Sequence, residues 1–321
     1  MSRAMLGSYY DSAMDFRKGR LYMRNSIKIA MLGGDRRQIA GVRQLSEHYI
    51  INVWGIDGAY FENESDVNVF SELSDCLDGV SAAVLPLPAS PDGIMLSCPL
   101  ASERSEQKLM GILKYLSEGC LIVGGKLPER FIKVAEASGY KVVDYFESEE
   151  FQIKNAYITA EAALSIAMNT LDKSIKGSRV AITGYGRIAK HLCSLLLSLG
   201  AMVTVTARNE SELLWAEANG CDILLLDEER RALDALKSGY DVIYNTVPCW
   251  LFSRDYLSEL DKNTLIVDLA SAPGGVDIKA ARELGANVNW ATSLPGKYAP
   301  RSAGALIGEC IDSIISREVK L

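Results

Sequence analysis

The sequence predicts an α/β protein with two doubly wound parallel sheets joined by long helices. Short apolar runs alternate with amphipathic stretches along most of the chain, which is typical of parallel strands separated by helices. The length of 321 residues is enough for two domains, each with its own core. Residues 151–172 interrupt the alternation with helical spacing and no strand character, so the chain is expected to divide there.

The composition is that of an ordinary globular protein, with 48% hydrophobic and 23% charged residues. A net charge of −7 argues against nucleic-acid binding, which needs a basic surface. The chain has no apolar run long enough for a membrane span and no recognisable signal peptide, so we expect a cytoplasmic protein without membrane contact. Seven scattered cysteines and only two histidines, His48 and His191, predict reduced thiols and no metal site.

The first domain is expected to bind the substrate. Residues 1–25 lack the alternation and are predicted to form a disordered tail, and an N-terminal α/β domain follows over residues 26–150. An apolar helix at residues 301–318 comes after the last strand of the second domain and is expected to cross back and complete the first. The strands of the first domain are predicted at residues 27–32, 50–54, 82–85, 120–123 and 141–143.

The second domain, residues 151–300, is predicted to hold the linking helix and a dinucleotide-binding domain of the Rossmann type. Its number of strands matches the size of such a domain. A cleft between the two domains is the expected place for a small ligand. The strands are predicted at residues 179–183, 202–206, 222–226, 241–244, 265–268 and 288–290.

A glycine pattern follows the first strand of this second domain. Gly184, Gly186 and Ala189 form G-x-G-x-x-A between the strand and a helical segment. In a dinucleotide site the first glycine permits a tight turn, the second lets the backbone approach the pyrophosphate, and the small third residue lets the helix pack on the strand. Free N–H groups at the helix N-terminus then bind the phosphates. The pattern predicts a nicotinamide dinucleotide here.

The tip of the next strand favours NADP over NAD. NAD sites carry an acidic residue about 20 residues beyond the glycines, which binds the ribose hydroxyl. Here the strand ends in Thr206, Ala207 and Arg208, without an acid. The guanidinium of Arg208 can bind the 2′-phosphate of NADP, although Glu210 nearby is unfavourable to an anion.

Two further loops at strand ends are expected to border the nicotinamide, because ligands of doubly wound sheets bind beyond the carboxyl ends of the strands. The side chain of Asn245 can position the carboxamide or the ribose through hydrogen bonds. Turns built by Asn and Pro explain the same residues without a ligand. The cofactor contacts predicted from these loops are Asn245, Thr246, Val247, Pro248, Leu269 and Ala270.

Several cations at strand ends favour a substrate that carries carboxylates, although each one alone is also explained as a solvated surface residue. Neither histidine is placed for catalysis, and a hydride transfer that yields an aromatic product needs no strong base. Glu161 and Lys297 are the remaining catalytic candidates. The predicted substrate-binding residues are Asp35, Arg36, Thr159, Glu161, Lys297 and Arg301.

Six segments together resemble the family of dipicolinate synthase A subunits, from spore-forming bacteria. The opening GGDRRQ and the segment TAEAALSIAM select this family, because the last two segments are also similar to those of alanine dehydrogenases. The resemblance runs from about residue 27 to the C-terminus. The segments, in chain order, are KIAMLGGDRRQ, NAYITAEAALSIAM, TGYGRIAKHL, NTVP, DLASAPGG and LPGKYAPRSAG.

The resemblance implies an NADP-dependent oxidoreductase of sporulation that acts with a flavoprotein-like partner, the B subunit of dipicolinate synthase. The chain is also expected to form homo-oligomers. The implied substrate is the cyclic C7 diacid from the dihydrodipicolinate synthase step, which loses water and two hydrogens to become dipicolinate. The cofactor contacts implied around the pyrophosphate and the 2′-phosphate are Gly184, Tyr185, Gly186, Arg187, Ile188, Thr206, Arg208, Asn209 and Ser211.

Two other functions fit much of the same sequence. An amino-acid dehydrogenase of the alanine dehydrogenase type has the same two-domain plan, but it should carry a catalytic histidine and aspartate in the cleft, and the scarcity of histidine weighs against it. An NADP-binding redox regulator would bind the cofactor and oxidise nothing, because Rossmann domains also bind without catalysing.

Overall fold

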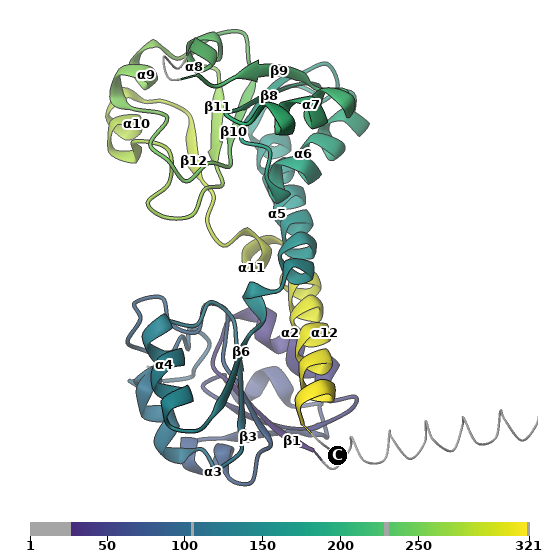
Figure 1. The fold of residues 1–321 in the computed structure, drawn as a ribbon, viewed down its shortest axis with the longest axis vertical. Helices are drawn as coiled ribbons and strands as arrows, with labels where there is room; N and C mark the ends of the chain where they lie inside the picture. The colour runs from purple at the N-terminus through teal and green to yellow at the C-terminus, as the bar shows by residue number, and fades with distance from the viewer. Residues whose placement is uncertain (1–26, 104–105, 228–230, 320–321) are drawn as a thin grey trace, which may run out of the picture. The chain divides into compact units, whose positions relative to one another are not determined.

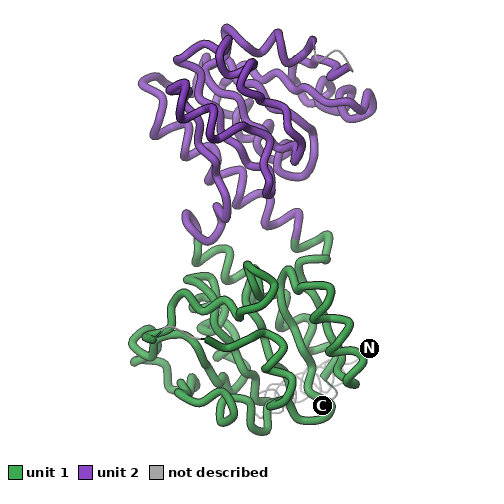
Figure 2. Tube along the Cα trace, turned by 90° about the vertical axis from the view of Figure 1, so that its left-hand side faces the viewer, with its two compact units in different colours: residues 1–151, 300–321 green, residues 152–299 purple. Residues whose placement is uncertain are grey.

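The computed structural model describes residues 27–103, 106–227 and 231–319, and the predicted tail at residues 1–25 lies outside them. The chain forms two compact units (Figure 2). Unit 1 comprises residues 1–151 and 300–321, and unit 2 comprises residues 152–299. Each unit contains one six-stranded parallel sheet flanked by helices, which confirms the predicted fold class (Figure 1).

The strands of unit 1 are β1 (Lys28–Leu32), β2 (Ile50–Trp54), β3 (Val67–Phe70), β4 (Ala82–Val84), β5 (Leu121–Gly124) and β6 (Lys141–Asp144). They pair in parallel in the order β3-β2-β1-β4-β5-β6. The order reverses between β1 and β4, so the carboxyl ends of these two strands form the topological switch point. The prediction lacks β3, because this strand is short and the polar Asn68 interrupts the apolar run that marks a buried strand.

The helices of unit 1 are α2 (Arg36–Leu45), α3 (Leu73–Leu77), α4 (Glu129–Ala137) and α12 (Pro300–Glu318), with 3₁₀ turns η1 (Gly58–Phe61), η2 (Leu109–Tyr115) and η3 (Tyr145–Glu147). α12 packs along α2, as Figure 1 shows. Glycines permit this close approach: a Cβ at Gly304 would lie 2.2 Å from the Arg37 carbonyl oxygen, and one at Gly308 would lie 2.9 Å from Gln44 Oε1. The helix at the end of the sequence is therefore part of the first sheet's unit.

The strands of unit 2 are β7 (Arg179–Thr183), β8 (Met202–Ala207), β9 (Asp222–Leu225), β10 (Val242–Asn245), β11 (Leu265–Asp268) and β12 (Val288–Trp290). They pair in parallel in the order β12-β11-β10-β7-β8-β9. The predicted strands of this domain coincide with them to within about one residue at each end. The switch point lies between β7 and β10, where Thr183 and Asn245 stand in register.

The helices of unit 2 are α5 (Glu149–Thr170), which begins in unit 1, α6 (Arg187–Ser198), α7 (Glu210–Ala218), α8 (Arg231–Ala235), α9 (Arg254–Glu259), α10 (Ile278–Leu284) and α11 (Leu294–Tyr298). Small residues such as Ala160 and Ala163 are fully buried where α5 joins the core of unit 2. The Tyr244 hydroxyl donates to the Ala163 carbonyl at 3.3 Å, which ties α5 to β10. Within the described ranges, no helix has the length and apolar character to cross a membrane.

Candidate dinucleotide site

The loop between β7 and α6 begins with a turn that only glycine fits. Gly184 has a φ of +85°, and its N–H donates to the Thr206 carbonyl at 2.7 Å. A Cβ at this position would lie 2.7 Å from Thr246 Oγ1. The positive φ and the close approach both exclude a side chain, so the turn runs directly against the loop after β10.

Gly186 lies in open space at the start of α6. It is the N-cap residue of α6, and no side chain at this position accepts a hydrogen bond from the first N–H groups of the helix. A Cβ there would meet none of the described atoms within 4 Å. The first-turn N–H groups of α6 can therefore be approached by a pyrophosphate, which the positive end of the helix dipole attracts. Ala189 is fully buried and lets α6 pack on the core, as the glycine pattern predicts.

Three buried polar side chains join the ends of β7, β10 and β11. Asn245 Oδ1 accepts from Thr183 Oγ1 at 2.6 Å, and Asn245 Nδ2 donates to Asp268 Oδ1 at 2.7 Å. The same amide accepts from the Val247 N–H at 3.2 Å and donates to the Val247 carbonyl at 3.1 Å. All hydrogen-bonding positions of the Asn245 amide are thus used inside the chain, and its contact with the cofactor stays a prediction. The amide shapes the loop.

Asp268 folds the loop that follows β11. Its carboxylate accepts from the Ala270 N–H at 3.2 Å and from the Gly275 N–H at 2.9 Å. A Cβ at Gly275 would lie 2.2 Å from Asn245 Nδ2, so the loop closes tightly over the amide. Leu269 and Ala270 are buried, which leaves their backbone, rather than the predicted side chains, to meet a ligand.

A cavity of about 620 Å³ in unit 2 is lined by Arg208 at the tip of β8 and by Val247 after β10. Glu210 and Asp227 line the same cavity, so one guanidinium shares it with two carboxyl groups. The hydrogen bond from the Arg231 side chain lowers the pKa of Asp227, which keeps that carboxyl ionised. The remaining lining residues, which the sequence reasoning missed, are Leu225, Leu226, Cys249 and Leu251.

Three other predicted cofactor contacts have structural roles. Asn209 caps α7, because its Oδ1 accepts from the Ser211 N–H at 2.9 Å. Tyr185 is buried, and its hydroxyl accepts from Asn219 Nδ2 at 3.4 Å. Thr206 is fully buried within β8. Asn209 and Tyr185 thus bond within the fold, whereas the Thr206 hydroxyl has no hydrogen-bond partner among the described residues. Contact of these three residues with the cofactor stays a prediction.

The other predicted contacts lie on the loops themselves. Ile188, in the first turn of α6, packs partly against the core. The Thr246 hydroxyl donates to the Thr183 carbonyl at 2.7 Å. Pro248 is exposed, and the Arg187 side chain donates to Gln152 of α5. The loop therefore offers a ligand mainly backbone groups and the surface of Val247.

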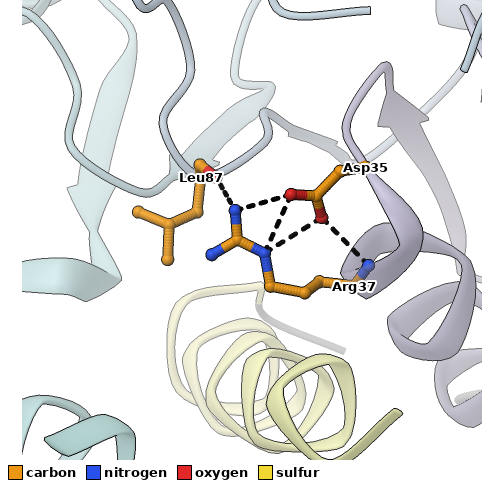
Figure 3. A network of polar contacts seen from close by, with 3 residues as sticks. All are labelled: Asp35, Arg37 and Leu87. Atoms are coloured by element: carbon orange, nitrogen blue, oxygen red, sulfur yellow. Dashed lines mark hydrogen bonds and ion pairs between the residues drawn. The ribbon is translucent and has the colours of Figure 1, made fainter. Parts of the chain in front are cut away.

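In unit 1 the predicted substrate residues separate. Asp35 caps α2 and binds the side chain of the buried Arg37, with Nη2 and Oδ2 2.8 Å apart, so its carboxylate is occupied within the chain (Figure 3). Arg36 and Arg301 line one cavity of about 560 Å³ beside α2 and α12. The structure thus places Arg36 and Arg301, two of the predicted cations, in one cavity, whereas the Asp35 carboxylate bonds to α2 and to Arg37.

In unit 2 the predicted substrate residues lie on α5 and α11. The Thr159 hydroxyl donates to the Asn155 carbonyl at 2.8 Å within the helix, and its contact with the substrate stays a prediction. Glu161 on α5 and Lys297 on α11 are both exposed. Among the residues that the structure describes, no cluster of side chains suited to a metal ion occurs.

The sequence places Arg37 in the strand-end segment expected to contact a ligand but does not select it as a substrate-binding residue, and Asp227 was missed. Arg37 follows Arg36 directly, but consecutive residues of a helix lie on different faces. Arg37 lies on the same face of α2 as Gly41, and a Cβ at Gly41 would lie 3.4 Å from the Gly304 carbonyl oxygen of α12. Asp227 comes shortly after β9, and position after a strand end is the signal that could have found it.

The sequence and the fold of this chain are both similar to those of known proteins. Residues 28–146 match the family model of the N-terminal domain of the dipicolinate synthase A subunit. The A subunit of dipicolinate synthase from Bacillus subtilis (strain 168) is 28% identical over 298 residues, which span 92% of this chain and 97% of that protein. The crystal structure of the dipicolinate synthase A subunit from Bacillus halodurans matches with a TM-score of 0.80 at 25% identity and covers 92% of this chain and 98% of that one. Over nearly its whole length the chain is similar to dipicolinate synthase A subunits, and residues 28–146 match the family's N-terminal domain.

The chain shares its fold with more distant proteins. A transhydrogenase from Sinorhizobium meliloti has a TM-score of 0.63 at 12% identity and covers 91% of this chain and 94% of that one. An L-alanine dehydrogenase has a TM-score of 0.60 at 12% identity, covering 91% and 90% of the two chains. At such identity the likeness concerns the fold alone.

Proposed function

We propose that this chain is an NADP-dependent oxidoreductase that converts the cyclic C7 diacid from the dihydrodipicolinate synthase step to dipicolinate. The observation that carries the proposal is the edge of unit 2, where the open position at Gly186 and the cavity beside Arg208 accompany the glycine turn. Similarity to dipicolinate synthase A subunits supports dipicolinate as the product, and the substrate is the one that the sequence resemblance implies.

The chain's own groups account for binding the dinucleotide. The first turn of α6 holds the pyrophosphate through backbone N–H groups, and Arg208 holds the 2′-phosphate. The backbones after β10 and β11 border the nicotinamide, and Asn245 and Asp268 hold both loops in place. When bound, the nicotinamide supplies the hydride acceptor. Loss of water and of two hydrogens, one as hydride and one as a proton, gives the aromatic diacid.

The cations of the chain attract the diacid. In unit 1, Arg36 and Arg301 share one cavity and contact a carboxylate. In unit 2, Lys297 and Glu161 are the candidates for transferring the ring proton. We expect Arg36→Ala to raise KM for the diacid by about tenfold, since a lost charge-assisted hydrogen bond is worth roughly 1.5–3 kcal/mol. An unchanged KM in Arg36→Ala and Lys297→Ala would remove both residues from the site.

The names of the relatives designate one subunit of a dipicolinate synthase, which implies that the chain acts beside another subunit. In the proposal the partner is the flavoprotein-like B subunit of dipicolinate synthase, the chain itself forms homo-oligomers, and the reaction takes place in the cytoplasm during sporulation. Size-exclusion chromatography with light scattering tests the homo-oligomer, and co-purification with the B subunit tests the complex.

The absorbance of the reduced nicotinamide separates the three candidate functions. With NADP and the C7 diacid, we expect an increase in absorbance at about 340 nm, whereas NADP with alanine should give none. The opposite pattern would identify an amino-acid dehydrogenase. Cofactor binding without absorbance change in either reaction, even with the B subunit added, would identify a regulator.

Cofactor choice is tested at Arg208. Fluorescence titration should show that NADP binds about 10- to 100-fold more tightly than NAD, because one charge-assisted hydrogen bond contributes roughly 1.5–3 kcal/mol. Arg208→Ala should remove most of that difference, and Arg282→Ala, an exposed arginine on α10, should leave it unchanged. Because the ion pair is screened, the preference should also fall with added salt. Equal affinities in the unmodified protein would reject the NADP assignment.

A further inference from the structure

The carboxyl edge of the unit 1 sheet carries two cations that the proposed function leaves unused. Arg37 lies in the first turn of α2, after β1, and Lys126 lies just after β5. The switch point of this sheet lies between β1 and β4. Ligands of doubly wound sheets bind beyond strand ends at such a point, so both cations stand near the place where a ligand is expected.

Arg37 is buried and only partly satisfied. Its side chain is 8% exposed, and Nε donates to Asp35 Oδ1 at 2.9 Å, while Nη2 donates to Asp35 Oδ2 and to the Leu87 carbonyl. Within the described part of the chain, Nη1 has no hydrogen-bond partner, and Figure 3 shows this third nitrogen without a dashed line. The guanidinium is therefore fixed in orientation by two neighbours and keeps donors for a third.

Two more buried polar groups lie at the same edge. The Tyr145 hydroxyl and Gln38 Nε2 are buried and have no hydrogen-bond partner among the described residues. A Cβ at Gly125 would lie 2.8 Å from the Tyr145 ring, and one at Gly34 would lie 2.7 Å from Gln38 Cβ, so both groups flank the glycines that end β5 and β1. Buried polar groups nearly always have a partner, and these two point to one supplied from outside the chain.

Lys126 adds an exposed ammonium on a strained backbone. Its φ is +52°, and only one other described non-glycine residue, Ser293, also has a positive φ. The Asp144 carboxylate holds this conformation by accepting the Lys126 N–H at 3.1 Å. Nζ lies 4.7 Å from the centroid of the Phe146 ring and, within the described ranges, forms no ion pair. Strain of this kind persists where the surrounding structure enforces it, often at ligand sites.

One loop connects the two cations. The Leu87 carbonyl accepts from Arg37 Nη2, and a Cβ at Gly125, next to Lys126, would lie 2.8 Å from Leu87 Cδ1. The Ala89 N–H also donates to the Gly125 carbonyl at 3.0 Å. The loop after β4 is therefore packed between the ends of β1 and β5, with Arg37 at one side and Lys126 at the other.

We propose that Arg37 Nη1 and Lys126 Nζ, on the two sides of this loop, bind a small dicarboxylate at this edge of unit 1. The inference rests on the proposed function and deepens it, because a dianion needs a second contact besides Arg36 and Arg301. The ligand class follows from the two cations, which keep unused donors, and from the buried Tyr145 hydroxyl and Gln38 amide, which lack a partner among the described residues. No bond is made or broken in this step.

The test is calorimetric titration of pyridine-2,6-dicarboxylate into the full chain without cofactor. Lys126→Met should weaken binding by about tenfold, because it removes the ammonium and keeps the length of the side chain. Lys126→Gly should weaken it as much without lowering Tm, since glycine adopts positive φ without strain. Lys133→Met is the matched control, because this lysine is exposed on α4 and pairs with Glu129. Arg37→Lys should also weaken binding, but it can disturb folding through Asp35.

The outcomes separate this inference from the proposed function. Unchanged affinity in both Lys126 variants, or no binding to the unmodified chain, would overturn the carboxylate site. NADP titration and the absorbance assay at about 340 nm test the proposed function independently. If the Lys126 variants bind the diacid more weakly but the unmodified chain transfers no hydride, the carboxylate site is supported and the proposed reaction is not. If the chain transfers hydride but the Lys126 variants bind the diacid as tightly as the unmodified chain, the reaction is supported and the carboxylate site is not.

Discussion

Asn245 Nδ2 donates to Asp268 Oδ1 at 2.7 Å, and neither side chain is exposed. The two residues end neighbouring strands, β10 and β11, and each also bonds to the loop that follows its own strand. Through the Thr183 hydroxyl the same network reaches the strand that leads into the glycine turn. The three loops at this edge of unit 2 are therefore held by one set of buried hydrogen bonds.

Asn245→Ala should lower the free energy of unfolding by about 3 kcal/mol, because the buried Thr183 hydroxyl loses its acceptor and the buried Asp268 carboxylate loses one of its three donors. Urea unfolding followed by circular dichroism measures the change. Asn289→Ala, an exposed asparagine on β12, is the control and should stay within about 0.5 kcal/mol of the unmodified protein. Similar losses in the two variants would show that the network does not stabilise unit 2.

Gly186→Ala should abolish most dinucleotide binding and leave Tm unchanged, because a methyl group there touches none of the described residues and occupies the path to the helix N-terminus. Gly184→Ala should reduce both binding and Tm, since its Cβ would lie 2.7 Å from Thr246 Oγ1 at a φ of +85°. Thermal unfolding and cofactor fluorescence distinguish the two. Normal binding by the Gly186 variant would place the pyrophosphate elsewhere.

NADP should slow the alkylation of Cys249, because this exposed thiol lines the same cavity as Arg208. Burial raises the pKa of Cys76 to about 12 and that of Cys120 to about 11, so these thiols should react slowly with iodoacetamide at about pH 8, with or without cofactor. Mass spectrometry of tryptic peptides gives the rate at each residue. A Cys249 rate that NADP does not change would argue against the cavity as the nucleotide site.

The contribution of Asp144 to stability should decrease as pH rises. Burial raises the pKa of its carboxyl, although the N–H groups of Leu127, Phe146 and Lys126 act in the opposite direction. The folded chain therefore holds this proton more tightly than the unfolded chain. The contribution is complete below the unfolded-state pKa of about 3.9 and is lost as pH rises through the raised native value.

Urea unfolding of the unmodified chain and of Asp144→Asn across pH values from about 3.5 to 7 measures this contribution. The difference in free energy of unfolding between the two should shift in favour of Asp144→Asn as pH increases. Glu136→Gln, an exposed carboxyl on α4, serves as the control and should show no such trend. A difference that is flat, or that moves toward the unmodified chain, would contradict the raised pKa.

Much of the fold can be predicted from the apolar pattern of the sequence, and the strand that this pattern misses has a physical cause. Strands such as β7 are buried on both faces, so their residues form an uninterrupted apolar run that the sequence displays. β3 is short and lies at the edge of its sheet with Asn68 and Val69 exposed, so it shows no such run. Periodicity detects burial, and an exposed edge strand offers little of it.

The candidate site divides in the same way. Gly184 could be predicted, because only its backbone conformation matters and glycine marks that conformation in the sequence. Asn245 could not be assigned, since a polar residue after a strand suits a ligand and a buried network equally well. Only the positions of Thr183 and Asp268, which are distant in sequence, decide between these roles.

Unit 1 is discontinuous in sequence, since it ends with α12, and this has a consequence for synthesis on the ribosome. All strands of the first sheet emerge early, yet the glycine-lined face of α2 waits for residues 300–318, which emerge after the whole of unit 2. Unit 2 can therefore fold while unit 1 is still open along α2. A nascent chain stalled before Pro300 would hold a finished unit 2 while α2 in unit 1 stays uncovered, and an uncovered helix face is the kind of surface that chaperones bind.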